Sequence, residues 1–269
     1  MAKVIEYELK LPYYPSILIY GASDAGKTVL ASCSPDLDPK ETVVVPDVLF
    51  FDAEGGMISH ITRGAGIIVE RYPKDTEKLT NSKEALGAGI DYLKANKDRF
   101  HYAVLDSLDR YQECAIDNII RAKSHERAEI QDWGDVLTML QRLGRSVPTW
   151  GVTVVFTCHS EEAIDQNDRV MKRMPLIQGK FRGKLESYFD LVGYYERVVE
   201  DSGEIKRILY TQGTRRFKAR SRLGVCLPDM IVNPTIPSII SEYRNRRADV
   251  IKQLKANPNI KVKIIGEDI

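Results

Sequence analysis

One eight-residue segment restricts what this chain can fold into more than any other feature of its sequence. The letters GASDAGKT, from Gly21 to Thr28, match the pattern G-x-x-x-x-G-K-[ST] at every fixed position, and they directly follow the apolar run Ser16 to Tyr20. Glycines let a loop bring its backbone N–H groups close to an anion, and this pattern between a strand and a helix is typical of a phosphate-binding loop. The predicted phosphate-binding residues are Gly21, Ala22, Ser23, Asp24, Ala25, Gly26, Lys27 and Thr28.

Two side chains at the end of this loop have separate expected roles. Lys27 is expected to neutralise the β- and γ-phosphates of a nucleoside triphosphate, and Thr28 to offer its hydroxyl to Mg²⁺. A buried-type strand, AVLD, ends at Asp106, and open α/β sheets bind their ligands at the carboxyl ends of strands. Asp106 is therefore the candidate for holding Mg²⁺, with a simple cap of the next helix as the alternative. The predicted cofactors are ATP and Mg²⁺.

The composition is that of a folded protein from a reducing compartment. The chain has 269 residues, enough to bury one α/β core, with 43% hydrophobic and 29% charged residues. A net charge of +1 argues neither for nor against a polyanionic partner. The four cysteines lie far apart without metal-ligand spacing, which favours the cytoplasm. The start MAKVIEYELK is not a signal peptide and no apolar run reaches membrane-spanning length, so we expect neither export nor membrane insertion.

Apolar runs and helical patterns alternate along the first part of the chain. This order is typical of a mostly parallel sheet with crossover helices, so we predict an α/β fold. The expected strands are Ser16 to Tyr20, Val48 to Asp52, Ile67 to Glu70, His101 to Leu105 and Val152 to Thr157. The expected helices run from Lys27 to Cys33, from Ser82 to Lys97, from Leu108 to Ala122 and from Trp133 to Arg145.

The remainder of the chain has a different pattern. Ser160 to Lys184 is polar and basic without a clean period, which predicts a long loop. Strands return at Leu191 to Val199 and Ile205 to Gln212, as an antiparallel pair. Thr235, followed closely by Pro237, predicts the start of a C-terminal helix. We therefore divide the chain into an ATPase core over residues 1–234 and a helical tail over residues 235–269.

Three strand ends together resemble a known family. Strands ending in DAEGG, LDS and TCHS follow the phosphate loop in the order found in RecA-like recombinase cores. In that family the glutamate at the first of these ends orients the attacking water, so the resemblance gives Glu54 the role of general base or water-positioning residue. The family commonly has a glutamine at the third end to sense the γ-phosphate. This chain has His159 there, and histidine can donate the same hydrogen bond.

Two basic segments extend the resemblance. Arg215 to Arg222 packs five cations into eight residues. In RecA-like proteins a similarly placed basic pair stabilises charge on the neighbouring subunit's nucleotide, which makes Lys218 and Arg220 the expected fingers. A solvated or DNA-contacting turn is the alternative.

RecA-like proteins also place a DNA-binding loop directly after the sensor strand, and an ordinary surface loop is the alternative here. The candidates for contact with single-stranded DNA are Lys172, Arg173, Lys180, Phe181, Arg182 and Lys184, with Phe181 offering a stacking surface.

Over Ser16 to Met230 the chain most resembles the phage-encoded, recombinase-like single-strand-annealing ATPases. The resemblance implies a RecA-like P-loop NTPase core with a mostly parallel central sheet, antiparallel strands near its C-terminal side and a C-terminal helix. It also implies ATP hydrolysis stimulated by single-stranded DNA, assembly into a ring or filament, and annealing or strand exchange in phage recombination within the bacterial cytoplasm. A single-strand-binding protein is a candidate partner.

Other classes of P-loop protein stay open at this point. A small-molecule or nucleotide kinase would use Ser160 to Lys184 as a lid, although Glu54 in a RecA-type position argues against it. A packaging or helicase-type motor typically has a glutamate directly after the strand-end aspartate, where this chain has Ser107. A nucleotide-dependent scaffold would bind ATP without turnover.

Overall fold

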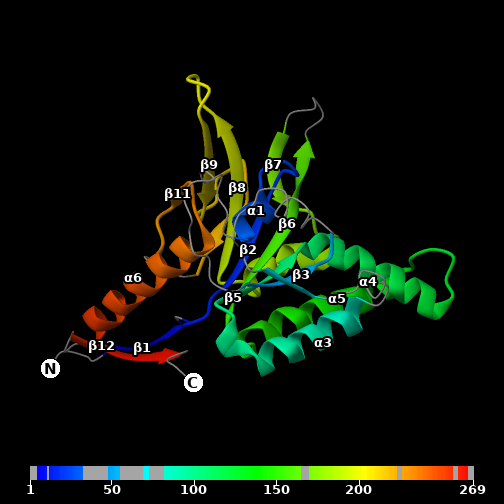
Figure 1. The fold of residues 1–269 in the computed structure, drawn as a ribbon, viewed down its shortest axis with the longest axis horizontal. Helices are drawn as coiled ribbons and strands as arrows, with labels where there is room; N and C mark the ends of the chain where they lie inside the picture. The colour runs from blue at the N-terminus through cyan, green and yellow to red at the C-terminus, as the bar shows by residue number, and fades with distance from the viewer. Residues whose placement is uncertain are drawn as a thin grey trace.

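A large, mostly parallel sheet forms the centre of the computed structural model, which describes residues 5–10, 12–32, 48–54, 69–72, 82–164, 170–222, 226–256 and 260–265. The strand order is β11-β9-β8-β2-β6-β5-β3-β4, with β10 beside β8 and β7 beside β6. Figure 1 shows its strands between two groups of helices. The strands are β2 Ser16–Gly21, β3 Val48–Asp52, β4 Val69–Tyr72, β5 Tyr102–Asp106, β6 Thr153–Ile164, β7 Val170–Pro175, β8 Leu191–Val199, β9 Ile205–Tyr210, β10 Arg220–Ser221 and β11 Met230–Val232.

The strand carrying the phosphate loop lies in the middle of this sheet. β2 pairs in parallel with β6 on one side and with β8 on the other, and β3, β4 and β5 continue the parallel part beyond β6. The pairs β8–β9, β9–β11, β8–β10 and β6–β7 are antiparallel. Because parallel strands end at the same edge, the carboxyl ends of β2, β3 and β5 come together, with His159 of the longer β6 beside the end of β2.

Alternate residues of the central strands face two separate apolar cores, as the twofold period of a strand requires. In β2, Leu18 and Tyr20 face a core that includes the helices α3 Ser82–Ala95, α4 Leu108–Lys123 and α5 Ile130–Ser146. Ile17 and Ile19 face the opposite core, which includes α1 Lys27–Ala31 and α6 Ile236–Ala256. The sheet is thus covered on both faces.

The C-terminal helix packs onto this second core. Ile236, Ile239 and Tyr243 of α6 are buried there. Thr235 caps its start, since the Thr235 hydroxyl accepts a 3.0 Å hydrogen bond from the backbone N–H of Ser238. Beyond α6, β12 Ile260–Ile265 pairs in parallel with β1 Ile5–Lys10 in a separate two-stranded sheet.

These elements confirm the predicted α/β fold class, with its antiparallel strands on the C-terminal side and its C-terminal helix. Several boundaries differ from the predictions. α5 begins three residues earlier than expected, and β9 ends at Tyr210. Cys33, the expected end of the first helix, and Ile67, the expected start of the third strand, lie outside the described residues.

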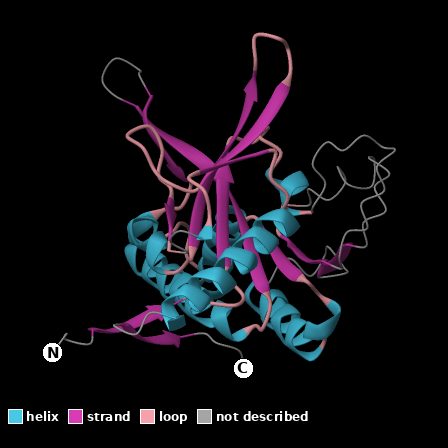
Figure 2. Ribbon diagram, turned by 90° about the vertical axis from the view of Figure 1, so that its left-hand side faces the viewer, coloured by secondary structure: helices cyan, strands magenta, loops and turns pink. Residues whose placement is uncertain are grey.

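The expected loop from Ser160 to Lys184 is wrong in its larger part. β6 continues past the core to Ile164 and pairs antiparallel with β7, and the 3-10 segment η4 Gly179–Ser187 follows. The polar sequence led to the prediction of a loop. A hairpin that projects from the core buries little apolar surface on either face, so its strands need no alternating apolar residues. Figure 2 shows this hairpin and the β8–β9 hairpin standing out beyond the helices. Two further 3-10 turns are η2 Lys97–Arg99 and η3 Val147–Thr149.

Among the described residues, no helix has the length and apolarity that a membrane crossing needs.

Candidate active site

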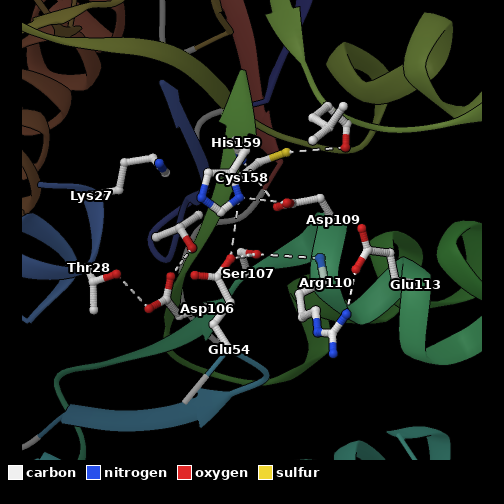
Figure 3. Close-up of polar contacts among 12 residues, drawn as sticks. Lys27, Thr28, Glu54, Asp106, Ser107, Asp109, Arg110, Glu113, Cys158 and His159 are labelled. Atoms are coloured by element: carbon white, nitrogen blue, oxygen red, sulfur yellow. Dashed lines mark hydrogen bonds and ion pairs between the residues drawn. The ribbon is translucent and has the colours of Figure 1, made fainter. Parts of the chain in front are cut away.

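The predicted chemistry-bearing residues meet at the shared edge of the parallel strands. The sheet register sets Gly21 of β2 beside His159 of β6, and Asp52 of β3 beside Asp106 of β5. Figure 3 shows the side chains of this edge converging from four parts of the chain. Thr28 and Asp106, 78 positions apart, and His159 and Asp109, 50 positions apart, are thereby brought within hydrogen-bonding distance.

The phosphate loop turns directly out of β2. Gly26 has a positive φ of 87°, which favours glycine, and α1 begins at the next residue. Lys27 is 5% exposed and its Nζ donates hydrogen bonds to the carbonyl oxygens of Gly21, at 3.1 Å, and Ala22, at 2.8 Å. Burial lowers the pKa of Lys27, although the nearby Glu54 carboxylate opposes this shift. The ammonium group is thus held inside the loop whose amides would surround phosphate.

Gly21 has no room for a side chain. A Cβ at this position would lie 2.1 Å from the carbonyl oxygen of Tyr195 in β8. The first glycine of the motif therefore serves strand packing as well as the turn into the loop.

Thr28 and Asp106 form the predicted metal-binding pair. Thr28 Oγ1 donates to Asp106 Oδ2 at 2.8 Å, and Thr157 of β6 donates to Asp106 Oδ1. Burial raises the pKa of Asp106 to about 6, while the hydrogen bonds from Thr157 and Thr28 limit the shift. A hydroxyl and a carboxylate in contact are oxygen ligands of the kind Mg²⁺ prefers, so these residues fit the ion.

Glu54 stands at the centre of the cluster. Its Oε1 accepts a hydrogen bond from the hydroxyl of Ser107, and its backbone N–H donates to the carbonyl oxygen of Asp106 at 3.2 Å and to Asp52 Oδ1 at 3.1 Å. The Glu54 side chain is 25% exposed. A carboxylate that is anchored through its backbone and still reaches solvent suits a water-positioning role. Gly55 and Gly56 lie outside the described residues.

His159 lies beside Glu54 and is held by a residue that the sequence did not single out. Nδ1 of His159 lies 2.7 Å from Asp109 Oδ2 and 3.4 Å from Glu54 Oε1, and its backbone N–H donates to Asp109 Oδ1 at 3.2 Å. The hydrogen bond with Asp109 raises the pKa of His159. In the sequence Asp109 is only an acidic residue in the first turn of a helix, where such residues are common. No motif distinguishes it.

The expected finger residues lie on a segment tied to the phosphate-loop strand. The Tyr20 hydroxyl accepts a 2.9 Å hydrogen bond from the backbone N–H of Lys218 and donates to the Lys218 carbonyl at 2.5 Å. Phe217 and Ala219 are buried, so Lys218 and Arg220 point the other way, as their alternation predicts. Lys218 Nζ lies 3.7 Å from Glu186 Oε1, and Arg220 is exposed.

The expected DNA-binding residues divide into two groups. Lys180 and Lys184 are exposed, while Arg173 pairs with Glu162 and Arg182 with Glu161. Lys172 in β7 is partly buried.

Phe181 departs from expectation. It is 2% exposed and its ring lies 5.1 Å from that of Tyr188. This corrects the expectation that Phe181 offers a stacking surface, because in this structure its ring is part of the apolar core.

A family model described as an AAA domain matches residues 14–223, about four fifths of the chain. The chain belongs to this AAA-domain family. The match spans β2 to β10, including the phosphate loop and the basic segments. The family implies a bound nucleotide and Mg²⁺, and Lys27, Thr28 and Asp106 are placed to hold them.

Two similar solved structures have low sequence identity to this AAA domain, and no curated protein matches it. A KaiC-like protein from the archaeon Pyrococcus horikoshii is 15% identical, with 77% of this chain and 81% of that chain covered and a TM-score of 0.40. The flagellar accessory protein FlaH from Methanocaldococcus jannaschii is 10% identical, with coverages of 82% and 85% and a TM-score of 0.41.

Proposed function

We propose that this chain hydrolyses ATP and that single-stranded DNA stimulates the hydrolysis. The observation that carries the proposal is the meeting of Lys27, the Thr28–Asp106 pair and Glu54 at one edge of the sheet. A site for binding alone would not need a partly exposed carboxylate next to the metal-binding pair. Glu54 is the residue that makes turnover, and not only binding, the best-supported function.

Each side chain of the site then has one task. Lys27 stabilises charge on the β- and γ-phosphates, and Glu54 orients the attacking water and accepts its proton. Mg²⁺, when bound by Thr28 and Asp106, supplies further positive charge to the phosphates. His159 donates a hydrogen bond to the γ-phosphate. The loss of this hydrogen bond after hydrolysis reports the state of the nucleotide.

The link to DNA runs along β6. His159 lies in this strand, and the same strand leaves the core to form the β6–β7 hairpin. The Leu176 N–H, just after β7, donates to the His159 carbonyl at 2.8 Å, so both arms of the hairpin are tied to the sensor position. The hairpin and the segment after it carry Lys172, Lys180 and Lys184, whose charges suit phosphates of a single strand.

The finer proposal is that of a phage recombination protein. In it, the chain assembles into a ring or filament, Lys218 and Arg220 contact the neighbouring subunit's nucleotide, and the assembly promotes annealing or strand exchange in the bacterial cytoplasm. A single-strand-binding protein is the proposed partner. The resemblance to recombinase-like annealing ATPases supports this proposal, and the exposed position of Arg220 is compatible with a contact between subunits.

The test measures the ATPase rate with and without single-stranded DNA, at low and at raised salt. We expect stimulation that weakens steeply as salt is raised. For electrostatic binding to a single strand, the logarithm of the binding constant falls with the logarithm of the salt concentration, with a slope of about −0.7 per phosphate contact. Lys27→Ala is the control and is expected to abolish both basal and stimulated turnover. Phosphate transfer to a small acceptor with indifference to DNA would show a kinase instead, and tight ATP binding without turnover would show a scaffold.

A further inference from the structure

Asp109 makes two hydrogen bonds to the same residue, His159, from a different element. One carboxylate oxygen accepts from the His159 backbone N–H at 3.2 Å, and the other lies 2.7 Å from Nδ1 of the ring. The Asp109 side chain is 8% exposed. A buried carboxylate that is hydrogen-bonded to both the backbone and the ring of one histidine fixes the position and the orientation of the ring.

The same contact fixes a proton. Burial raises the pKa of the Asp109 carboxyl, but the hydrogen bonds from His159 and the charge of His159 outweigh that effect and lower it. Asp109 is therefore an ionised acceptor, so the proton between the two residues belongs to Nδ1. With Nδ1 protonated, Nε2 can donate a hydrogen bond only when the ring is an imidazolium.

The free edge of the ring faces the phosphate loop. In Figure 3 the nitrogen of His159 that is not bonded to Asp109 lies on the side of Lys27. The hydrogen bond with Asp109 raises the pKa of His159 most, burial and the positive charge of Lys27 lower it, and the Glu54 carboxylate, 3.4 Å from Nδ1, adds to the increase. The Asp109 carboxylate is therefore the main contact that favours the charged form of His159.

We propose that Asp109 is a positioning residue of this ATPase, which keeps His159 as an imidazolium whose Nε2–H points at the γ-phosphate. The inference rests on the proposed function. It explains how a histidine can take the place where the resembled family commonly has glutamine. A glutamine amide donates without any proton to place, whereas a histidine needs a partner to set its protonation.

The helix α4 gives Asp109 a rigid base. Gln112, one turn further along the same buried face, donates to the Gln178 carbonyl at 3.1 Å and accepts from the Gln178 N–H at 2.8 Å. Ser107 caps the helix and also bonds Glu54. Ser107 and one face of α4 thus make hydrogen bonds to Glu54, His159 and the segment after β7.

The decisive test replaces Asp109 in two backgrounds. Asp109→Asn keeps the size and one acceptor oxygen but removes the charge. In the natural chain we expect kcat for ATP hydrolysis to fall about 10- to 100-fold, the range for losing a hydrogen bond to a charged group. In a His159→Gln chain, provided that it hydrolyses ATP, Asp109→Asn should change kcat less than about threefold. An equal loss in both backgrounds, or no loss in the natural chain, overturns the inference.

The chain offers a matched control. Asp132 Oδ2 lies 2.9 Å from Nδ1 of His125, so α5 contains a second buried carboxylate bonded to an imidazole. Asp132→Asn breaks a pair of the same kind outside the site, and kcat per folded molecule is expected to stay at the natural value. If Asp132→Asn lowers kcat as much as Asp109→Asn does, the effect is one of stability and the inference fails.

A spectroscopic readout separates protonation from folding. Ring nitrogen signals of His159 in a ¹H–¹⁵N spectrum, assigned by their absence in His159→Gln, should show protons on both Nδ1 and Nε2 in the natural chain and a neutral ring with one proton in Asp109→Asn. An unchanged proton distribution overturns the inference even if kcat falls. Failure of the natural chain to hydrolyse ATP under any condition would instead refute the proposed function, while the spectrum would still test Asp109.

Discussion

Thr28 Oγ1 donates a 2.8 Å hydrogen bond to Asp106 Oδ2, which joins the phosphate loop to the end of β5. The two residues are 78 positions apart in the chain. Their contact places a hydroxyl and a carboxylate side by side where the loop opens, the arrangement in which this class of site holds Mg²⁺.

Thr28→Val should therefore remove metal-dependent turnover without removing the fold. Valine has the shape of threonine but no hydroxyl, so we expect kcat to fall about 100-fold, because the metal contributes several kcal/mol to the reaction. The measurement is the ATPase rate over a Mg²⁺ titration. Thr28→Ser keeps the hydroxyl and should stay within about threefold of the natural rate. Equal rates for valine and serine would remove Thr28 from the metal site.

Gly21→Ala tests strand packing. Its Cβ would lie 2.1 Å from the Tyr195 carbonyl oxygen, so β2 and β8 would have to separate. We expect the free energy of unfolding to fall by about 3 kcal/mol, measured by denaturant titration. Gly87→Ala is the control, since Gly87 lies exposed in α3 with nothing within 4 Å of a new Cβ, and it should gain about 1 kcal/mol. The same sign for both variants would contradict this packing.

Phe181→Ala and Lys180→Ala separate core packing from DNA contact. Phe181 is buried, so its truncation is expected to cost about 3 to 5 kcal/mol of stability and to leave DNA affinity per folded molecule unchanged. Lys180 is exposed, so its truncation should change stability by less than about 0.5 kcal/mol and reduce the salt dependence of DNA binding. Loss of DNA affinity in Phe181→Ala at unchanged stability would restore its stacking role.

Lys218→Ala tests the finger role between subunits. We expect turnover to be abolished and ATP binding to be spared, because a finger stabilises charge that develops only during the transfer. Mixing Lys218→Ala with Glu54→Gln distinguishes the two geometries. If Lys218 serves the neighbouring site, a Lys218→Ala subunit has an intact Glu54 and receives Lys218 from its neighbour, so the mixture regains turnover. A mixture as inactive as its components would place Lys218 in its own subunit's site.

The Asp109–His159 pair should also give stability a pH dependence. The lowered pKa of Asp109 makes its contribution present above the unfolded value of 3.8, and lost as pH falls through the folded value. The raised pKa of His159 makes its contribution complete below the unfolded value of 6.5, and lost as pH rises through the folded value. The difference in unfolding free energy between the natural chain and Asp109→Asn should be largest between the unfolded values of 3.8 and 6.5. We expect it to reach about 2 kcal/mol there. A difference that is flat from pH 4 to pH 9 would contradict an ion pair.

Local sequence was enough to identify the phosphate loop and the class of fold. The pattern from Gly21 to Thr28 specifies its own turn, and the alternation of apolar strands with helical patterns specifies a parallel sheet. Asp106 could be selected because it ends a strand of an open α/β sheet, and Glu54 and His159 because the segments DAEGG and TCHS resemble those of RecA-like cores. The predictions of the phosphate loop and the fold class depend on the periodic spacing of apolar residues and on a short motif, and both can be read directly from the sequence.

Other features were decided by the tertiary structure. Asp109 has no sequence signal, because an acidic first-turn residue becomes a partner of His159 only when α4 lies against β6. Phe181 was read as exposed because its neighbours are basic, yet it is buried against Tyr188. The β6–β7 hairpin was read as a loop because its strands leave the core. The contact between Asp109 and His159 joins residues 50 positions apart, and the burial of Phe181 depends on the apolar core that the folded chain assembles around it, so no local pattern records either one.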